Sequence, residues 1–256
     1  MAIVAIGRNG IGLGHLSRMN ALCDALVKRG EKPVLLVQGS HQNALPIQVP
    51  TAPCPYRTGL NIRDQNLWRD RIETYAQLSN PAVIVEDTHS LGIRFSCRVR
   101  RVMLVRPLTY PSMCALLDDN RKACDKFLIA DEPQSPTWPY TEEETKHILS
   151  LTTVAGPVYR SAAPANISEA RTRYRDRRRN PIFVFSMGGG GEHSGANDGQ
   201  QFVIQATKVG RTVLEANSGA RLIFVKGPLF NSDLKIPSIF EIVNVEPNMN
   251  GLFGQL

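Results

Sequence analysis

A glycine-rich turn near the N-terminus carries the residues best suited to chemistry. It runs Gly10-Ile-Gly-Leu-Gly-His15, between a short apolar segment and a helical pattern. Glycines in such a turn let backbone N–H groups face an anion, and the helix N-terminus adds a partial positive charge. A histidine in the first helical turn is placed to act on a substrate bound there. The alternatives are a tight turn without a ligand and an ordinary capping or surface histidine.

Two familiar nucleotide-binding motifs are excluded at this turn. The dinucleotide fingerprint that starts at Gly10 and Gly12 needs glycine or alanine at position 15, where His15 stands. The next predicted strand ends in Gln38 rather than in an acid that could bind a ribose. No Gly-Lys-Ser/Thr follows, so the turn is not a P-loop either.

A second glycine-rich turn could also present its backbone N–H groups to an anion. Four consecutive glycines carry an entropic cost that plain turns avoid. Close approach of a phosphate or of another backbone would explain them, and a flexible interdomain loop is the alternative. The turn consists of Gly188, Gly189, Gly190 and Gly191, and it is followed by Glu192 and His193.

Acidic residues end one of the predicted buried strands. Glu86 and Asp87 directly follow the apolar segment 82–85. Ligand sites of α/β proteins gather outside the carboxyl ends of the strands, so both residues are candidates for substrate binding. Asp131 and Glu132 have the same position after a later strand. Solvated loop groups are the alternative for both pairs.

The sequence predicts neither a metal site nor a nucleic-acid platform, and no resident cofactor. The five histidines lack ligand spacing, and there is no Asp-x-Asp carboxylate clamp for a metal-bound nucleotide. Six arginines lie between Arg171 and Arg179 with one aromatic residue among them, Tyr174. A run without interleaved aromatic residues does not favour nucleic-acid binding. It suits phosphate groups, a membrane surface or simple solvation.

The elements that must position these residues predict a doubly wound α/β domain over residues 1–160. Strand 2–6, the first glycine turn, a helix with apolar residues at offsets of three and four from Leu16 to Val27, and strand 33–37 form a parallel crossover unit. Gly30 is expected to end the helix in the C′ position. The pattern continues with less clarity through strands at 47–49, 82–85, 102–105, 127–130 and 152–155 and a helix at 60–78.

A second, shorter α/β domain is predicted over residues 181–256. An arginine-rich linker, partly helical, covers 161–180. Strand 182–185, a helix at about 197–217 and strands 222–225 and 240–243 then repeat the opening pattern. Domains usually hold about 100–150 residues, so we expect this Rossmann-like domain to be incomplete, with a second chain as one way to complete it.

Composition agrees with an ordinary globular protein. The chain has 256 residues, of which 42% are apolar and 21% charged, and a net charge of +7, which allows an anionic partner. Five cysteines without Cys-x-x-Cys spacing indicate reduced thiols and a cytoplasmic location. No segment approaches the about 18 apolar residues of a membrane span, so only peripheral membrane contact stays open.

The motifs resemble those of GT-B glycosyltransferases. Gly12-Leu-Gly-His15-x-x-Arg18 with its helix is similar to the opening of that fold, above all in the peptidoglycan N-acetylglucosaminyltransferase group and the UDP-sugar hydrolase of pseudaminic acid synthesis. Gly156-Pro-Val-Tyr-Arg160 resembles the exit from the first domain, and Phe185-Ser-Met-Gly-Gly-Gly-Gly191 resembles the loop that opens the second.

The resemblance implies two Rossmann-like domains that face each other across a cleft, the first on the acceptor side and the second on the donor side. It implies that Gly12, Gly14 and His15 line the cleft, with His15 as the catalytic base of the hydrolase branch. It also implies that the second glycine turn approaches the donor diphosphate, and that no bound metal is needed. The predicted substrate-binding residues are therefore Gly12, Gly14, Arg18, Glu86, Asp87, Gly188, Gly189, Gly190, Gly191 and His193.

These expectations favour a metal-independent glycosyltransferase that moves a sugar from a nucleotide-diphosphate sugar, such as a UDP-sugar, to an unidentified acceptor. A nucleotide-sugar hydrolase of the same fold, with water as the nucleophile, is the first alternative. A non-catalytic acceptor-binding or partner-binding subunit of a split enzyme is the second.

Overall fold

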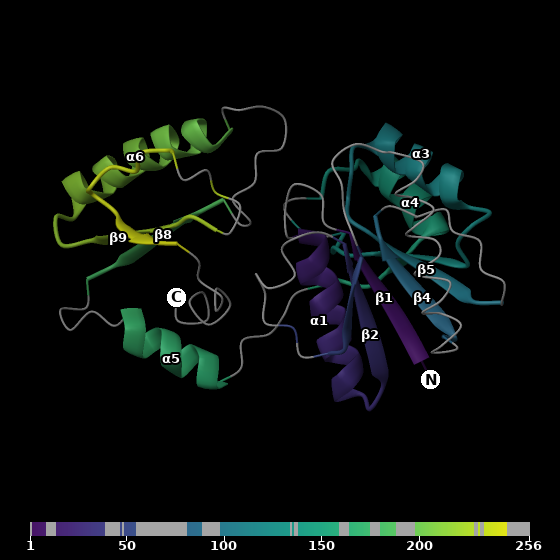
Figure 1. Ribbon diagram of the computed structural model, residues 1–256. Coiled ribbons are helices and arrows are strands. Elements are labelled where there is room, and N and C mark those ends of the chain that lie inside the picture. The colour runs from purple at the N-terminus through teal and green to yellow at the C-terminus, as the bar shows by residue number, and fades with distance from the viewer. Residues whose placement is uncertain are drawn as a thin grey trace. The chain divides into compact units, whose positions relative to one another are not determined.

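The chain divides into two compact units, seen in a computed structural model (Figure 1). Unit 1 comprises Met1–Asn9, His15–Gln42 and Ile47–Arg160; unit 2 comprises Gly10–Gly14, Asn43–Pro46 and Ser161–Leu256. The structure describes residues 2–8, 14–38, 47, 49–54, 81–88, 98–133, 135, 138–158, 164–174, 180–187, 198–227, 230 and 233–244. The predicted helix at 60–78 lies outside these residues.

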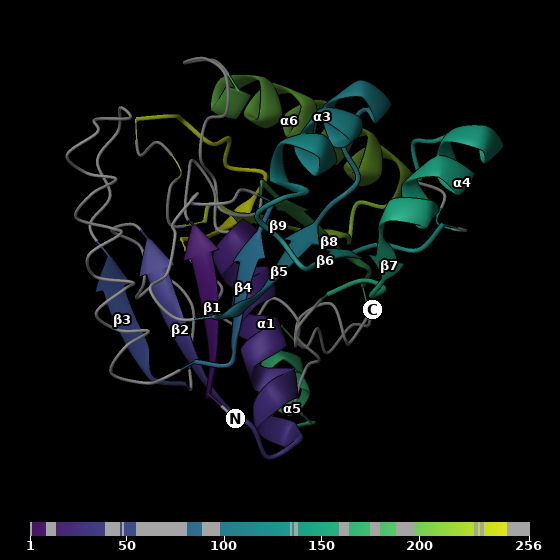
Figure 2. The ribbon, with the colours of Figure 1, turned by 90° about the vertical axis from the view of Figure 1, so that its right-hand side faces the viewer.

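The described residues of unit 1 form a parallel sheet of seven strands in the order β3-β2-β1-β4-β5-β6-β7 (Figure 2). Its central strands are apolar runs buried on both faces, as the all-parallel arrangement requires. The strands are β1 Ala2–Arg8, β2 Lys32–Gln38, β3 Thr51–Cys54, β4 Val83–Asp87, β5 Arg100–Val105, β6 Lys126–Ile129 and β7 Thr153–Val154.

The strand order reverses direction at β1, which pairs with β2 on one side and β4 on the other. Ile6 stands opposite both Leu36 and Glu86 in the two parallel pairings. The connections that leave β1 and β4 therefore diverge, and in open α/β sheets ligands bind outside the carboxyl ends of the strands at such a point. Residues that follow β1 and β4 are brought together at this point.

Helix α1, Gly14–Lys28, follows β1 and packs on the sheet through Leu16, Met19 and Cys23. Its end is a Schellman motif: Gly30 N–H donates to the Val27 carbonyl at 2.9 Å, and Glu31 N–H donates to the Leu26 carbonyl at 3.0 Å. Gly30 has φ +80°, a conformation that favours glycine. The predicted C′ position of Gly30 is confirmed.

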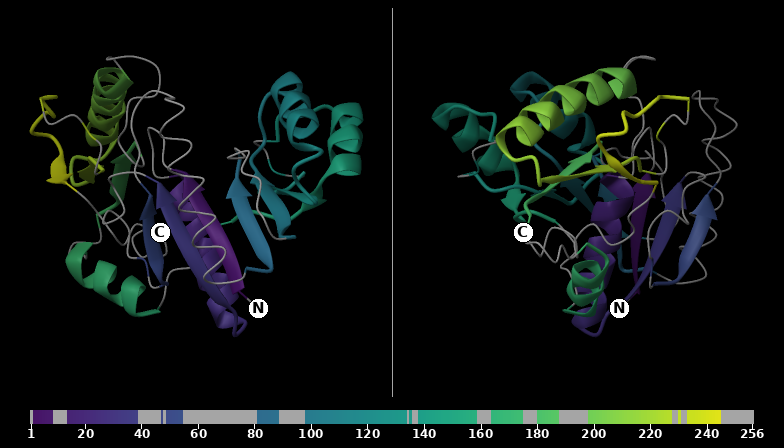
Figure 3. Two further views of the ribbon diagram at one scale, coloured as in Figure 1. Left: turned by 45° about the vertical axis from the view of Figure 1, so that its right-hand side comes forward. Right: turned by 90° about the vertical axis from the view of Figure 1, so that its left-hand side faces the viewer.

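Two further helices of unit 1 pack against β5 and β6. Helix α3, Tyr110–Asn120, buries Met113 and Leu117, and helix α4, Glu142–Leu151, buries Ile148. A capping box between Thr141 and Glu144 starts α4. Figure 3 shows α3 and α4 side by side at one end of the sheet.

The described residues of unit 2 form a three-stranded parallel sheet with a helix on each face (Figure 1). The strands are β8 Ile182–Ser186, β9 Arg221–Val225 and β10 Glu241–Val243, in the order β10-β9-β8. Alternate residues of β9 face opposite sides. Leu222 and Phe224 pack under α6, Asp198–Ala216, whereas Ile223 and Val225 pack on α5, Pro164–Tyr174.

One sequence prediction needs correction. The strand predicted at 47–49 instead begins at Thr51, and the chain joins β2 through the Pro50 carbonyl, which accepts from Leu35 N–H at 3.0 Å. Pro53 lies in β3 at the end of the strand order, where a residue without an N–H is tolerated.

The region predicted as a partly helical linker contains helix α5, which packs on β9. Its role as a linker between two domains stays a prediction.

Candidate functional site

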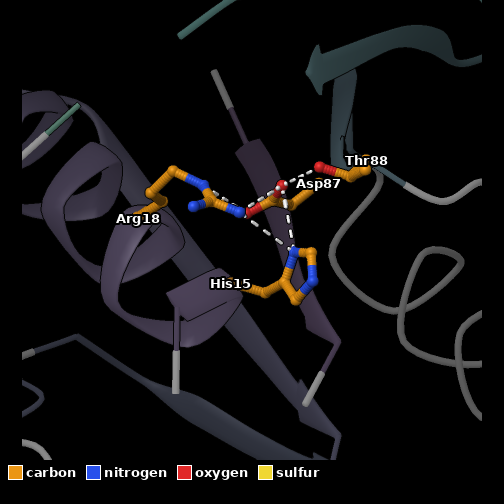
Figure 4. A network of polar contacts seen from close by, with 4 residues as sticks. All are labelled: His15, Arg18, Asp87 and Thr88. Atoms are coloured by element: carbon orange, nitrogen blue, oxygen red, sulfur yellow. Dashed lines mark hydrogen bonds and ion pairs between the residues drawn. The ribbon is translucent and has the colours of Figure 1, made fainter. Parts of the chain in front are cut away.

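Four polar residues of unit 1 meet at the reversal point of the sheet (Figure 4). His15 lies in the first turn of α1, and Arg18 follows three residues later on the same side of the helix. Asp87 is the last residue of β4, and Thr88 comes directly after it. The ends of β1 and β4 thus position the cluster.

The carboxylate of Asp87 is the centre of the cluster. Arg18 donates to it twice, from Nε to Oδ2 at 3.0 Å and from Nη2 to Oδ1 at 3.1 Å. Such a paired, charge-assisted contact fixes the plane of the carboxylate as well as its position. Asp87 is buried, whereas about a fifth of the Arg18 side chain is exposed (21%). The arginine therefore orients a carboxylate that water does not reach.

His15 completes the arrangement on the Oδ1 side. Its Nδ1 lies 3.1 Å from Asp87 Oδ1 and 3.2 Å from Arg18 Nη2. The guanidinium only donates and would need Nδ1 to accept, whereas the ionised carboxylate only accepts and needs a proton on Nδ1. The hydrogen bond from His15 helps to lower the pKa of Asp87, which corresponds to the tautomer with the proton on Nδ1. Nε2, on the edge of the ring away from Asp87, then carries the lone pair (Figure 4). A general base needs a histidine in this state, so the predicted role of His15 as the base stays a prediction.

The electrostatics keep Asp87 ionised. Burial by itself raises the pKa of this carboxyl, but the hydrogen bonds from His15 and Arg18 and the charge of Arg18 outweigh it and hold the pKa below its ordinary value. The negative charge therefore persists at neutral pH.

Thr88 supports the carboxylate from a strained backbone. Its φ is +60°, a region that a β-branched residue rarely adopts. Its N–H donates to the Leu104 carbonyl of β5 at 2.7 Å, and its hydroxyl donates to Asp87 Oδ1 at 2.8 Å. Strain of this kind costs about 1–3 kcal/mol and clusters at functional sites, where the surrounding structure holds it.

Glu86 does not join this cluster. Neighbouring strand residues point to opposite faces, and the buried Glu86 carboxylate accepts from Arg101 Nη2 at 3.1 and 3.2 Å. The structure thus separates two acidic residues that the sequence grouped together. A role for Glu86 in substrate binding stays a prediction.

The remaining predicted site residues divide by location. Gly14 is the first residue of α1 and is exposed. Asp131 and Glu132 lie in the loop after β6, where Glu132 N–H donates to Asp131 Oδ1 at 2.8 Å. This contact joins two residues adjacent in sequence. Gly12, Gly188, Gly189, Gly190, Gly191 and His193 lie outside the described residues, and their roles stay predictions.

The described ranges contain no group of three or more His, Cys, Asp or Glu residues that could hold a metal ion. None of the helices in the same ranges is long and apolar enough to cross a bilayer.

Sequence reasoning missed what Arg18 and Thr88 do in this cluster. The three-residue spacing of His15 and Arg18 was a usable signal, because it places both on one side of a helix. Thr88 gave no signal, since its contribution depends on a backbone angle that composition does not reveal.

Solved structures share this architecture at low sequence identity. A protein described as a UDP-N-acetylglucosamine 2-epimerase from Listeria monocytogenes has 11% identity and a TM-score of 0.59, covering 98% of this chain and 71% of its own. HepE of Anabaena, solved with UDP-glucose, has 12% identity and a TM-score of 0.57, covering 98% and 71%.

A transferase from Siraitia grosvenorii, solved with UDP, has 13% identity and a TM-score of 0.52. The match covers 93% of this chain but 63% of the transferase, so the chain spans less than two thirds of that protein. No protein-family model and no curated protein matches the sequence. The structural similarities confirm the predicted GT-B-like fold, with Rossmann-like α/β units.

Proposed function

We propose that this chain is a UDP-sugar-binding enzyme of GT-B type and that it transfers the sugar to an acceptor hydroxyl without a metal ion. The His15–Asp87 contact of 3.1 Å at the reversal point of the sheet is the observation that carries the proposal. Structures of similar fold were solved with UDP and with UDP-glucose, which supports the class of donor.

The chemistry follows from the tautomer of His15. Nε2 accepts the proton of the acceptor hydroxyl as its oxygen attacks the anomeric carbon of the donor. The bond from that carbon to the diphosphate oxygen breaks, and the nucleoside diphosphate leaves with the electron pair. Asp87 stabilises the imidazolium through Nδ1, and Arg18 holds Asp87 in place. The N-terminus of α1 supplies partial positive charge for the leaving diphosphate.

Hydrolysis of the nucleotide sugar is the second candidate. The Gly12-Leu-Gly-His15-x-x-Arg18 motif favours it, because it is similar to the opening of a UDP-sugar hydrolase. A base that removes a proton from an acceptor hydroxyl can also activate water, so the two reactions need the same residues.

Release of UDP from a panel of UDP-sugars tests both reactions. We expect release from the purified chain to depend on His15 and Asp87. Release without an acceptor supports hydrolysis, and release only with a mixture of sugar and lipid-linked acceptors supports transfer. Ser17→Ala, an exposed change on α1 between the two cluster residues, is the matched control. Equal release by the native chain and His15→Gln would contradict the proposal.

A further inference from the structure

A second cluster of reactive side chains lies between α3 and α4, apart from His15 and Asp87. Tyr110 and Cys114 are four residues apart and share one side of α3. Both reach His147 on α4: the Tyr110 hydroxyl lies 2.8 Å from Nδ1, and the Cys114 sulfur lies 4.0 Å from the same nitrogen. The thiol of Cys114 and the phenol of Tyr110 thus both lie near Nδ1 of the His147 imidazole.

The cluster is open to solvent. His147 is exposed, and Tyr110 and Cys114 are half-buried. Thiols react as thiolates, and a neighbouring group that accepts the proton favours that form. Nδ1 of His147, 4.0 Å from the Cys114 sulfur, is placed to accept the proton of Cys114.

We propose that Cys114, assisted by His147 and Tyr110, is a modification site at which a low-molecular-weight disulfide such as oxidised glutathione forms a mixed disulfide. The Cys114 proton passes to His147 Nδ1, and the thiolate attacks one sulfur of the disulfide. The disulfide bond breaks, the new bond joins Cys114 to one glutathione, and the other glutathione leaves as a thiolate that takes a proton from solvent.

The electrostatic surroundings explain why His147 is needed. Partial desolvation, the hydrogen bond with Cys114 and nearby negative charge raise the pKa of Tyr110, so its hydroxyl stays protonated and able to donate to the thiolate. Glu143 and Glu144 at the start of α4 add negative charge near the cluster. In the proposed step, the proton that His147 takes from Cys114 leaves a positive charge next to the thiolate.

Two other cysteines provide an internal comparison. Burial, with the charge of Asp24 as a smaller cause, raises the pKa of Cys23 to about 12. Burial, with the charge of Glu86 next, raises the pKa of Cys124 to about 11. Both thiols are therefore protonated at neutral pH. Cys23 is also buried, whereas Cys124 is half-buried like Cys114, so the comparison with Cys124 depends on its raised pKa.

The test measures the rate of mixed-disulfide formation at each cysteine by mass spectrometry, at pH 7 with excess oxidised glutathione. We expect Cys114 to react at least about tenfold faster than Cys23 and Cys124. We expect His147→Gln to slow Cys114 by about tenfold, and Tyr110→Phe to slow it by a smaller factor. A reducing agent should release the adduct.

Lys146→Gln is the matched control. Lys146 is the exposed neighbour of His147 and contacts Glu142 at 2.7 Å, so its loss changes the same turn without touching the thiol. Circular dichroism checks that each variant is folded. An unchanged Cys114 rate in His147→Gln, or a Cys114 rate no higher than the rates of Cys23 and Cys124, would overturn the proposal.

Discussion

The residues of the cluster around Asp87 differ in burial and charge, and these differences indicate a different proposed role for each. Asp87 is buried and ionised, His15 is partly exposed at 22%, and Arg18 connects the two. The partly exposed histidine can reach a substrate, while the buried carboxylate can act only through its neighbours. His15 is therefore the proposed catalytic residue, and Asp87 and Arg18 are positioning residues.

Replacing His15 by Gln should lower turnover by about 10²–10⁴-fold, the usual contribution of a positioned acid or base. The melting temperature should change little, because the Gln amide can still donate to Asp87. Steady-state UDP release and thermal unfolding, measured on the same preparation, check this. Retained turnover together with a large loss of melting temperature would assign His15 a structural role only.

Replacing Asp87 by Asn should also lower turnover by about 10²–10⁴-fold, because the amide no longer fixes the proton on Nδ1 of His15. It should cost about 1–3 kcal/mol of stability, because Arg18 loses its charged partner. Glu86→Gln is the control at the neighbouring position. It disturbs a buried pair on the other face of β4, so it should lower stability without abolishing turnover.

The pH dependence of stability should reveal the same carboxylate. The folded state holds the pKa of Asp87 below its ordinary value of 3.8, so the unfolded chain binds the proton more readily. The stabilisation is fully present above that value and is lost as pH falls through the folded pKa. Urea unfolding between neutral pH and pH 3 should show that the difference in free energy of unfolding between the native chain and Asp87→Asn shrinks as the pH falls. A constant difference would contradict this.

Helix α6 approaches its sheet closely at Gly210. Gly210 is buried in the interior of α6, where a side chain would face β9 and the loop before β10. A Cβ at this position would lie 2.9 Å from Leu222 Cδ1 and 3.3 Å from Phe240 Cζ. Glycine is unfavourable in a helix, but a larger residue here would have to displace the Leu222 and Phe240 side chains.

Gly210→Val should therefore destabilise the chain by about 1–3 kcal/mol through overpacking. Gln205→Val introduces the same side chain at an exposed position of α6 and should change stability by no more than about 0.5 kcal/mol. Chemical denaturation of the two variants gives the comparison. Equal stabilities would show that α6 shifts freely on the sheet.

The whole molecule should be stabilised by its donor nucleotide. A ligand that binds only the folded state raises the free energy of unfolding by about 2.7 kcal/mol at 100 times its dissociation constant. We expect UDP to raise the melting temperature of the full chain and AMP to have a smaller effect. A response to neither nucleotide would contradict the proposed donor class.

The sequence by itself determined the local elements and the fold class. Apolar runs identified most of the strands, offsets of three and four identified α1, and Gly30 correctly marked its end. These signals are local, because the apolar pattern of a strand or of a helix face depends only on residues close together in the sequence. The strand at 47–49 was wrong because the prolines around it obscured where the pairing begins.

Only the tertiary structure decided which residues meet. Glu86 and Asp87 are neighbours in sequence, yet strand alternation sends one to Arg101 and the other to His15 and Arg18. The contact between Arg18 and Asp87 spans 69 positions and depends on β4 pairing beside β1. Strand order is a property of the folded sheet rather than of any segment. The site at its reversal point therefore appears only when the chain is folded.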